Sequence, residues 1–491
     1  AHRDLALSAD AKLAIKDSRC DALTLALHEA TVTDGAWALL EAQAPAIYEL
    51  LPQELVRIGD IRATGALSYS SAQTNLNVQA MTGAGNVALG VKLDSKGDYA
   101  VTLKGETIEV AQVIPGSVLA QTDLDIQVKG VIDNPALLRQ KPFPSLDKLQ
   151  ASLSGTVAAT ATHTHVLGYE YDSIRFNGEY APRDYQATLT LDDSNGALSL
   201  DVGYLKERRT PQYTVALRAD SLNLHAMNLI GMHEGATFSM QLMADLRGRD
   251  LDHLMGKIVA DSLAMHRPTG DYVIEEIALY ASDPASKMLS LKSDFMDATL
   301  RGEFTYQSLV NSLFGHLHHS LPSLCFGHDH NHELSENICL INVGVYNTDP
   351  LRELLAIPVD IMGKAQFDLL INDPAGELTF IGMVPQIDYD GNTLKGVSID
   401  CSSKEQGLSL SLGGTLHNED VPAITALLAT KAEDDKVDLG LLWNSNPAGV
   451  FEGIFHTRAA FMLDDDDNLC VSIESDSTHT TINHSVWELD P

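Results

Sequence analysis

Aromatic and thiol side chains are scarce in this sequence. Phe, Trp and Tyr make up only 6% of the 491 residues, and the five cysteines are far apart, with no Cys-x-x-Cys pair among them. So few and so scattered thiols exclude a disulfide framework and argue against a structural zinc site. The apolar share of the sequence, 44%, comes largely from Leu, Val, Ile and Ala.

Long apolar runs are missing as well. No stretch approaches the roughly 20 uninterrupted apolar residues that a membrane-spanning helix needs. The opening residues, AHRD, do not resemble a signal peptide. We therefore expect the sequence to be the middle portion of a longer protein.

Basic residues are outnumbered two to one by acidic residues. The sequence has 33 Lys and Arg against 67 Asp and Glu, which gives a formal net charge of −34. Such a surface repels the phosphate backbone of nucleic acids, and no basic stripe with interleaved aromatic residues is present. We therefore expect no nucleic-acid partner.

The strongest positive signal is the alternation of apolar and polar residues, interrupted by Gly, Asn and Asp at the expected turns. Such a period of two is typical of strands with one buried and one wet face. It predicts a mainly β protein, an elongated, curved antiparallel sheet with an apolar inner face and few short helices. The residues predicted to line that face are Val101, Leu103, Leu124, Ile126, Val128, Val215, Leu217, Phe238, Met240, Leu242, Phe367, Leu369, Leu408 and Leu410.

Internal repetition supports this architecture. A segment of about fifty residues matches the chain again at an offset of 114 residues, which takes Tyr99 to Tyr213. We predict repeat units at about 60–165 and 175–280. Val101 and Val215 are then expected to face the same side of the sheet.

Helical periodicity is confined to short segments, at 46–56, 250–255 and 306–319. The segment 424–441 has a helix-like composition, but its alternation around an acidic centre favours a hairpin. Between about 308 and 344 the sequence becomes rich in His, Asn and Pro, which marks the only plausible internal boundary. We place this boundary near residue 330, between β-repeats in 1–330 and a continuing sheet in 331–491.

A sheet that is apolar on one face must have that face covered. One possibility is a barrel, sandwich or roll that fills its interior with its own side chains. The other is a trough whose lining is completed by acyl chains. Alternation alone does not choose between them.

The repeated pattern Tyr-x-Val-x-Leu, at 99–103 and at 213–217, resembles the AsmA-like repeats of TamB proteins. The C-terminal stretches LSLSLGG at 408–414, LGLLWNSNP at 439–447 and INHSVWELDP at 482–491 resemble the middle of TamB-like proteins (translocation and assembly module) of the Bacteroidota type. The resemblance covers nearly the whole chain and depends on pattern, because this family has no catalytic signature.

This resemblance implies a periplasmic β-trough of a Gram-negative bacterium, anchored in the inner membrane. Its implied function is to carry phospholipid, held by its acyl chains, between the inner and outer membranes and to support outer-membrane protein assembly. The implied partner of the intact protein is an outer-membrane assembly protein of the Omp85/TamA type. The alternative is a structural or adhesive periplasmic or secreted β-repeat protein with a filled core and no lipid transport.

Histidines gather between positions 316 and 332, and His328, His330 and His332 are weak candidates for metal ligands. The dilution of these histidines by Asn and Ser favours a mobile, solvated linker without metal. The acidic run at 464–467 lacks the Gly and the distal Glu of an EF-hand loop. We find no nucleophile elbow or other catalytic motif, so we expect neither enzymatic activity nor a cofactor.

Overall fold

The computed structural model describes residues 5–16, 19–43, 56–139, 148, 151–207, 210–282, 287–324, 335–404, 407–418, 421–448, 450–464, 468–475 and 478–489. The chain forms a single open antiparallel sheet of 29 strands, with 69% of residues in strands and 11% in helices. This confirms the mainly β, antiparallel fold with few short helices. The helices are α1 (Asp34–Gln43), α4 (Val110–Val113), α6 (Tyr306–Ser320) and α7 (Asp349–Leu355), with 3-10 turns η1 (Pro135–Arg139), η2 (Leu251–His253) and η4 (Asp373–Ala375).

The chain divides into two compact units. The first comprises Ala1–Asp245 and Ser262–Val273, and the second comprises Leu246–Asp261 and Ile274–Pro491. The boundary that we placed near residue 330 stays a prediction. Within the second unit the sheet continues past that position, because β17 (Met296–Glu303) pairs with β18 (Ile338–Val345).

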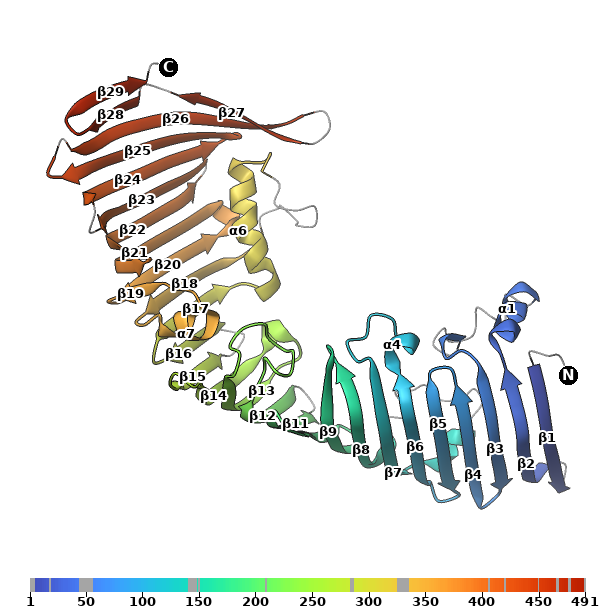
Figure 1. Ribbon diagram of the computed structural model, residues 1–491. Helices are drawn as coiled ribbons and strands as arrows, with labels where there is room; N and C mark the ends of the chain where they lie inside the picture. Colours follow the sequence, from blue (N-terminus) through green and yellow to red (C-terminus); the bar gives the residue numbers. More distant parts are fainter. Residues whose placement is uncertain are drawn as a thin grey trace. The chain divides into compact units, whose positions relative to one another are not determined.

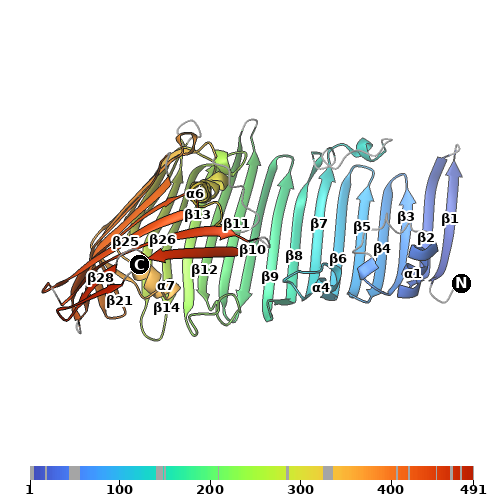
Figure 2. The ribbon, with the colours of Figure 1, turned by 90° about the horizontal axis from the view of Figure 1, so that it is seen from above.

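In the first unit, consecutive strands pair antiparallel all the way from β1 to β12. Figure 2 shows β1–β9 lying side by side in chain order. The strands are β1 (Leu5–Lys16), β2 (Arg19–Val32), β3 (Ile61–Ser70), β4 (Gln73–Thr82), β5 (Gly85–Asp94), β6 (Asp98–Glu109), β7 (Gln121–Ile132), β8 (Leu153–Val166), β9 (Tyr169–Ala181), β10 (Asp184–Asp193), β11 (Gly196–Lys206) and β12 (Pro211–Leu222).

Residues of β13 (Thr237–Arg247), β14 (Met255–His266) and β15 (Tyr272–Ala281) are shared between the two units. In the second unit β18 pairs with β20, while β27 and β28 both pair with β26. The remaining strands are β16 (Met288–Ser293), β19 (Asp360–Met362), β20 (Ala365–Asn372), β21 (Glu377–Tyr389), β22 (Asn392–Lys404), β23 (Gly407–Asn418), β24 (Val421–Glu433), β25 (Lys436–Asn446), β26 (Phe451–Leu463), β27 (Leu469–Ser475), β28 (Thr478–Ile482) and β29 (Ser485–Leu489).

Tight turns join most neighbouring strands. In the hairpin of β24 and β25, the turn residues Asp434 and Asp435 have φ of 50° and 60°. Two successive positive φ angles match the right-handed twist of the flanking strands, and Asp tolerates this conformation. The predicted hairpin at 424–441 is therefore confirmed.

The helix predictions had mixed outcomes. The predicted helix at 306–319 is confirmed as α6, and the segment 250–255 contains the short turn η2. Of the predicted helix at 46–56, residues 46–55 lie outside the described part of the chain. The sequence analysis missed α1, α4 and α7, although Asp349 and Pro350 at the start of α7 are residues that favour a helix N-terminus.

Among the described residues, much of the sheet has no second layer packed on it. The accessible surface is 29665 Å², whereas a compact monomer of 53.1 kDa exposes roughly 18,000 Å². Figure 1 shows the longest helix, α6, lying over strands of the second unit, while α1 and α4 lie at one end of the strands of the first unit.

Candidate functional site

One face of the first unit is apolar across ten neighbouring strands, β3–β12. Residues directly opposite each other in paired strands share a face, so the register places residues of all ten strands in common cross-strand rows. We call the face that carries the following three rows the apolar face of the first unit. The rows are Leu67, Leu76, Val91, Val101, Val128, Val157, Gly178, Ala187, Val202, Val215; then Gly65, Val78, Leu89, Leu103, Ile126, Ala159, Phe176, Leu189, Leu200, Leu217; then Ala63, Ala80, Val87, Gly105, Leu124, Ala161, Ile174, Leu191, Leu198, Ala219.

The opposite face of the same strands is polar. The next residue along each strand belongs to a cross-strand row that consists mainly of polar and charged side chains. This row is Ser68, Asn75, Lys92, Ala100, Lys129, Thr156, Glu179, Gln186, Gly203 and Thr214.

The rows place the equivalent residues of the two predicted repeats on one face. Val101 and Val215 lie in one row, and Leu103 and Leu217 lie in the next, so these four side chains share the apolar face. Leu124, Ile126 and Val128 lie on the same face. The register therefore brings seven of the predicted lining residues onto one surface.

Residues of β13 extend this surface. Met240 packs against a buried cluster that includes Ala219, and Ile174, Leu191 and Leu198 of the apolar face pack against the same cluster. Strand alternation places Phe238 and Leu242 on the same side of β13 as Met240. The three predicted lining residues of β13 thus adjoin the apolar face.

Coverage of the apolar face is confined to strand ends in the described part of the first unit. The segment 223–236 lies next to the ends of β9–β12 and contributes Met227, which is 1% exposed, to the cluster of Tyr171, Ala219 and Leu222. Side chains in the middle of the rows are partly exposed, and Val202 is 40% exposed. The centre of the face is therefore shielded mainly by its own neighbouring side chains.

A row of tyrosines ends the apolar face on the other side. Tyr99, Tyr180, Tyr185, Tyr204 and Tyr213 belong to one cross-strand row, which we call the tyrosine rim. The ring centroid of Tyr204 is 5.8 Å from that of Tyr185 and 5.3 Å from that of Tyr213. The rim therefore presents a connected aromatic surface.

Two glycines allow the tyrosine rim to continue across β7 and β8. Gly130 and Gly155 occupy the positions between Tyr99 and Tyr180 in the row, and the two tyrosine hydroxyls hydrogen-bond to each other across them. A Cβ on Gly130 would lie 2.6 Å from the Tyr99 hydroxyl oxygen, and a Cβ on Gly155 would lie 2.8 Å from that of Tyr180. These positions therefore require glycine for the tyrosines to meet.

The second unit has an apolar face of its own, built in the same way. Phe367, Leu369, Leu408 and Leu410, the remaining predicted lining residues, all lie on it. Three cross-strand rows define this face from β17 to β26. They are Ala298, Val343, Phe367, Gly382, Ile399, Leu412, Leu428, Leu441, Phe455; then Leu300, Ile341, Leu369, Phe380, Cys401, Leu410, Thr430, Leu439, Thr457; then Gly302, Cys339, Ile371, Leu378, Ser403, Leu408, Ala432, Val437, Ala459.

Helix α6 lies along the third of these rows. Tyr306 and Leu309 of α6 pack on a buried cluster of Phe304, Cys339 and Ile371, and the helix also contacts β23. Cys339 and Ile371 are 2% and 1% exposed. Because burial disfavours the thiolate, the pKa of Cys339 is raised to about 11, and Asp373 adds to this effect.

Polar groups dock α6 on the sheet. The carboxylate of Asp373, which is fully buried, accepts hydrogen bonds from Ser312 Oγ at 2.6 Å, from the backbone N–H of Asn337 at 3.1 Å and from His316 Nε2 at 3.1 Å. Asn337 Nδ2 donates to Ser312 Oγ at 2.5 Å. Burial lowers the pKa of His316 below its usual value, although the hydrogen bond to Asp373 opposes this shift. The ring is therefore neutral at neutral pH and donates Nε2–H to Asp373.

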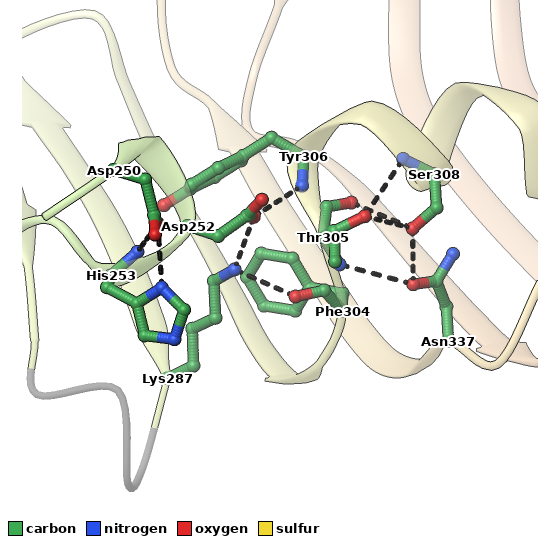
Figure 3. Close-up of polar contacts among 9 residues, drawn as sticks. All are labelled: Asp250, Asp252, His253, Lys287, Phe304, Thr305, Tyr306, Ser308 and Asn337. Carbon is green, nitrogen blue, oxygen red and sulfur yellow. Dashed lines mark hydrogen bonds and ion pairs between the residues drawn. The ribbon is translucent and has the colours of Figure 1, made fainter.

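The N-terminus of α6 is fixed by an ion pair (Figure 3). Asp252 accepts from Lys287 Nζ at 2.8 Å and from the backbone N–H of Tyr306 at 2.9 Å. Lys287 Nζ also donates to the backbone oxygen of Phe304 at 2.8 Å and lies 4.3 Å and 4.5 Å from the ring centroids of Phe304 and Tyr306. The hydrogen bond from Lys287 is the main reason that the pKa of Asp252 is lowered.

A pocket of about 830 Å³ adjoins this ion pair. Its lining includes Asp252, Lys287, Arg301 and Glu303, and it includes none of the residues predicted to line the apolar face. We therefore assign the pocket to the anchor of α6.

Beyond its C-terminus, α6 is held by the turn between β24 and β25. Asp435 Oδ1 accepts from the backbone N–H of Ser323 at 2.7 Å, and its own N–H donates to the backbone oxygen of Ser320 at 3.2 Å. The side of α6 turned to the sheet carries the buried residues Ser312, Gly315, His316 and Ser320. Val310 and Leu313 point away from it and are 52% and 44% exposed.

The histidine-rich segment is only partly described. His316, His318 and His319 lie in α6, so the prediction of a mobile linker is wrong for this part, because His316 is buried and bonded to Asp373. The metal candidates His328, His330 and His332 lie outside the described residues. Among the residues that are described, no group of three or more His, Cys, Asp or Glu is arranged to hold a metal ion.

Comparisons with known proteins gave no match. No family model matches the sequence, and neither the curated proteins nor the solved structures contain a significant match. Within the described residues, none of the helices has the length and apolar character to cross a membrane.

Proposed function

We propose that this chain is a lipid conduit. In this proposal its apolar faces bind phospholipid by the acyl chains and let it move from strand to strand. The observation that carries the proposal is the set of three unbroken apolar rows across β3–β12, with covering segments only at the strand ends of the described first unit. With strands about 4.8 Å apart, ten strands form an apolar track of roughly 40 Å.

The energetics favour an acyl chain as the occupant. Each buried methylene contributes about 0.8 kcal/mol, so a chain of about sixteen carbons gains on the order of 10 kcal/mol before entropic costs. Rows of Val, Leu and Ala offer neither a charged barrier nor a polar site at which a moving chain would stall. The same rows offer no nucleophile or acid–base pair, and we therefore propose no enzymatic role.

The cellular setting in this proposal follows from the resemblance to TamB/AsmA-like proteins. We place the chain in the periplasm, as part of an inner-membrane-anchored protein that carries phospholipid between the two membranes and supports outer-membrane protein assembly. An Omp85/TamA-type protein is the proposed partner of the intact protein. A filled-core structural or adhesive β-protein is the alternative, and it requires a further layer over the three rows.

Native mass spectrometry and lipid extraction of the purified chain test this proposal. We expect phospholipid to copurify with the wild-type chain, to be lost in Leu103→Asp and to be retained in Thr102→Asp. These neighbouring positions of β6 lie on opposite faces, so the pair controls for an added charge. A wild-type chain that stays free of lipid, even after incubation with phospholipid vesicles, would contradict the proposal and favour the alternative.

A further inference from the structure

The two ends of the strands in the first unit differ in chemistry. At one end the apolar face finishes at the tyrosine rim, and at the other it meets the segment 223–236 and α4. Tyrosine has an apolar ring and a polar hydroxyl, and it is enriched where an acyl region meets water. Five tyrosines in one cross-strand row therefore indicate a boundary of that kind.

The turns at the two ends of the strands also differ in charge. At the tyrosine rim, the exposed residues Lys96, Arg183 and Lys206 lie in or beside the turns β5–β6, β9–β10 and β11–β12, and none forms an ion pair with a described residue. Asp94 and Asp98 flank Lys96, Asp184 follows Arg183 and Glu207 follows Lys206, so this end carries both signs. The connections at the other end from β4 onward, 83–84, 110–120, 167–168, 194–195 and 223–236, contain no Lys or Arg, and the connection between β2 and β3 contributes only Arg57 to that end.

This absence has a physical consequence for an anionic group. Strand residues beside the connections at that end include Glu109, Asp193 and Asp220, which repel a phosphate. The three exposed cations at the tyrosine rim, against Arg57 alone in the connections at the other end, make that rim the more favourable place for a phosphate.

We infer that a glycerophospholipid bound to the first unit lies in one orientation, with its phosphate headgroup at the tyrosine rim and its acyl chains on the three apolar rows. This inference rests on the proposed function and adds the orientation of the ligand. The hydroxyls of Tyr185, Tyr204 and Tyr213 donate hydrogen bonds at the level of the glycerol esters, and the exposed cations of the neighbouring turns attract the phosphate. The chain ends then point toward the segment 223–236.

Quenching of tryptophan fluorescence by positionally brominated phospholipid tests this orientation. The three native tryptophans are first replaced in the full chain (W37F, W443F, W487F), and single tryptophans are then introduced as Tyr204→Trp or Leu198→Trp. Both positions lie on the apolar face of β11, near its opposite ends. Thr214→Trp, on the polar face of β12, is the control.

The expected result is a reversal of the quenching order. Lipid brominated beside the glycerol ester should quench Y204W more than lipid brominated beside the terminal methyl group, whereas L198W should show the opposite order. T214W should be quenched by neither lipid. Equal ratios at positions 204 and 198, or the reverse order, would overturn the orientation while leaving lipid binding intact.

Absence of quenching at both positions would contradict the proposed function itself, so the two failures are distinguishable. A second variant set does not depend on the tryptophans. The charge reversals Arg183→Glu and Lys206→Glu should weaken the binding of phosphatidylglycerol vesicles several-fold more than that of phosphatidylcholine vesicles. Unchanged binding of phosphatidylglycerol vesicles by both variants would also overturn the assignment of the headgroup to this rim.

Discussion

The two units are built from the same kind of alternating strands, but they differ in how far one edge of the apolar face is covered. In the second unit α6 packs along part of one row, so that Ile371 and Cys339 become almost fully buried. In the first unit the segment 223–236 buries the ends of only a few strands, and the opposite edge ends in partly exposed tyrosines. The side chains of a cross-strand row are therefore buried where a helix packs on them and stay partly exposed where none does, although the strand pattern is the same.

Polar contacts explain why α6 stays on its row. Asp373, at the end of β20, gathers Ser312, His316 and Asn337 around one buried carboxylate. The side of α6 that faces the sheet therefore combines buried hydrogen-bonded residues with the apolar contacts of Leu309, while Val310 and Leu313 on the other side are exposed. The first unit has no helix of this length among its described residues.

The comparison predicts its largest effect for a carboxylate placed in the covered row. Ile371→Asp should lower the free energy of unfolding of the second unit by more than about 4 kcal/mol, because the new carboxylate replaces a packed side chain and has no access to water. Leu217→Asp, on the open face of the first unit, should cost roughly 1 kcal/mol because its carboxylate reaches water. Urea denaturation monitored by circular dichroism measures both. Similar losses for the two variants would show that the faces are equally closed.

Removing the buried acceptor under α6 should have the next largest effect. Asp373→Ala leaves three donors without their partner and should destabilise the docking of α6 by about 3 kcal/mol. The readout is the labelling rate of Cys339 by a maleimide, in a chain whose other four cysteines are replaced by serine. We expect slow labelling in the wild type, because the thiol is buried and its pKa is raised to about 11, and faster labelling in the variant.

As a control, Asp368→Ala removes a partly exposed carboxylate from the same strand, away from α6. The labelling rate of Cys339 should not change in this variant. If Asp373→Ala also left the rate unchanged, Asp373 would not be what holds α6 on the sheet.

A smaller effect on folding, but a clear effect on binding, is expected for Val215→Asp. The side chain is partly exposed, so we expect a loss of roughly 1 kcal/mol in folding stability. The carboxylate interrupts a row that crosses ten strands, and transfer of phospholipid between vesicles should therefore fall sharply. Thr214→Asp, one residue away on the polar face, should leave transfer unchanged. Normal transfer by a folded Val215→Asp chain would show that this row does not line the lipid path.

The smallest predicted effect is a pH dependence confined to α6. The pKa of His316 is lower in the folded chain than in the unfolded chain, so the unfolded state binds the proton more readily. The resulting stability is present above a pH of about 6.5 and is lost as the pH falls below that value. Amide hydrogen exchange in α6 should therefore speed up in mild acid relative to His316→Gln, which retains a donor toward Asp373. A constant ratio from pH 7.5 to pH 5.5 would contradict this prediction.

The periodicity of apolar residues predicted most of the fold but not which segments pack on the sheet or with which side. The alternation at 99–103 and 213–217 correctly indicated that Val101 and Val215 share a face, because the period of a strand fixes which side each residue takes. The leucines at 309, 313 and 317 correctly predicted a helix, but they did not reveal which side of it is buried. That side depends on Asp373, which lies 57 residues beyond His316 in the sequence.

The tyrosine rim was also beyond sequence analysis. Tyr99 and Tyr213 were recognised as repeat equivalents, but Tyr180, Tyr185 and Tyr204 join them only through the register of intervening strands. Turn geometry sets that register, and Gly130 and Gly155 leave the space in which Tyr99 and Tyr180 meet, which no single-strand pattern reveals.

Site-specific photo-crosslinking on β11 tests the central claim most directly. A benzophenone amino acid is placed at Leu200, in the middle apolar row, or at Asp201, the next residue and on the polar face. Each chain is irradiated in the presence of radiolabelled phospholipid vesicles and then analysed for adducts. We predict a phospholipid adduct at position 200 and none at position 201. Equal labelling at the two positions, or no lipid adduct at position 200, would contradict the proposal that the apolar face holds lipid.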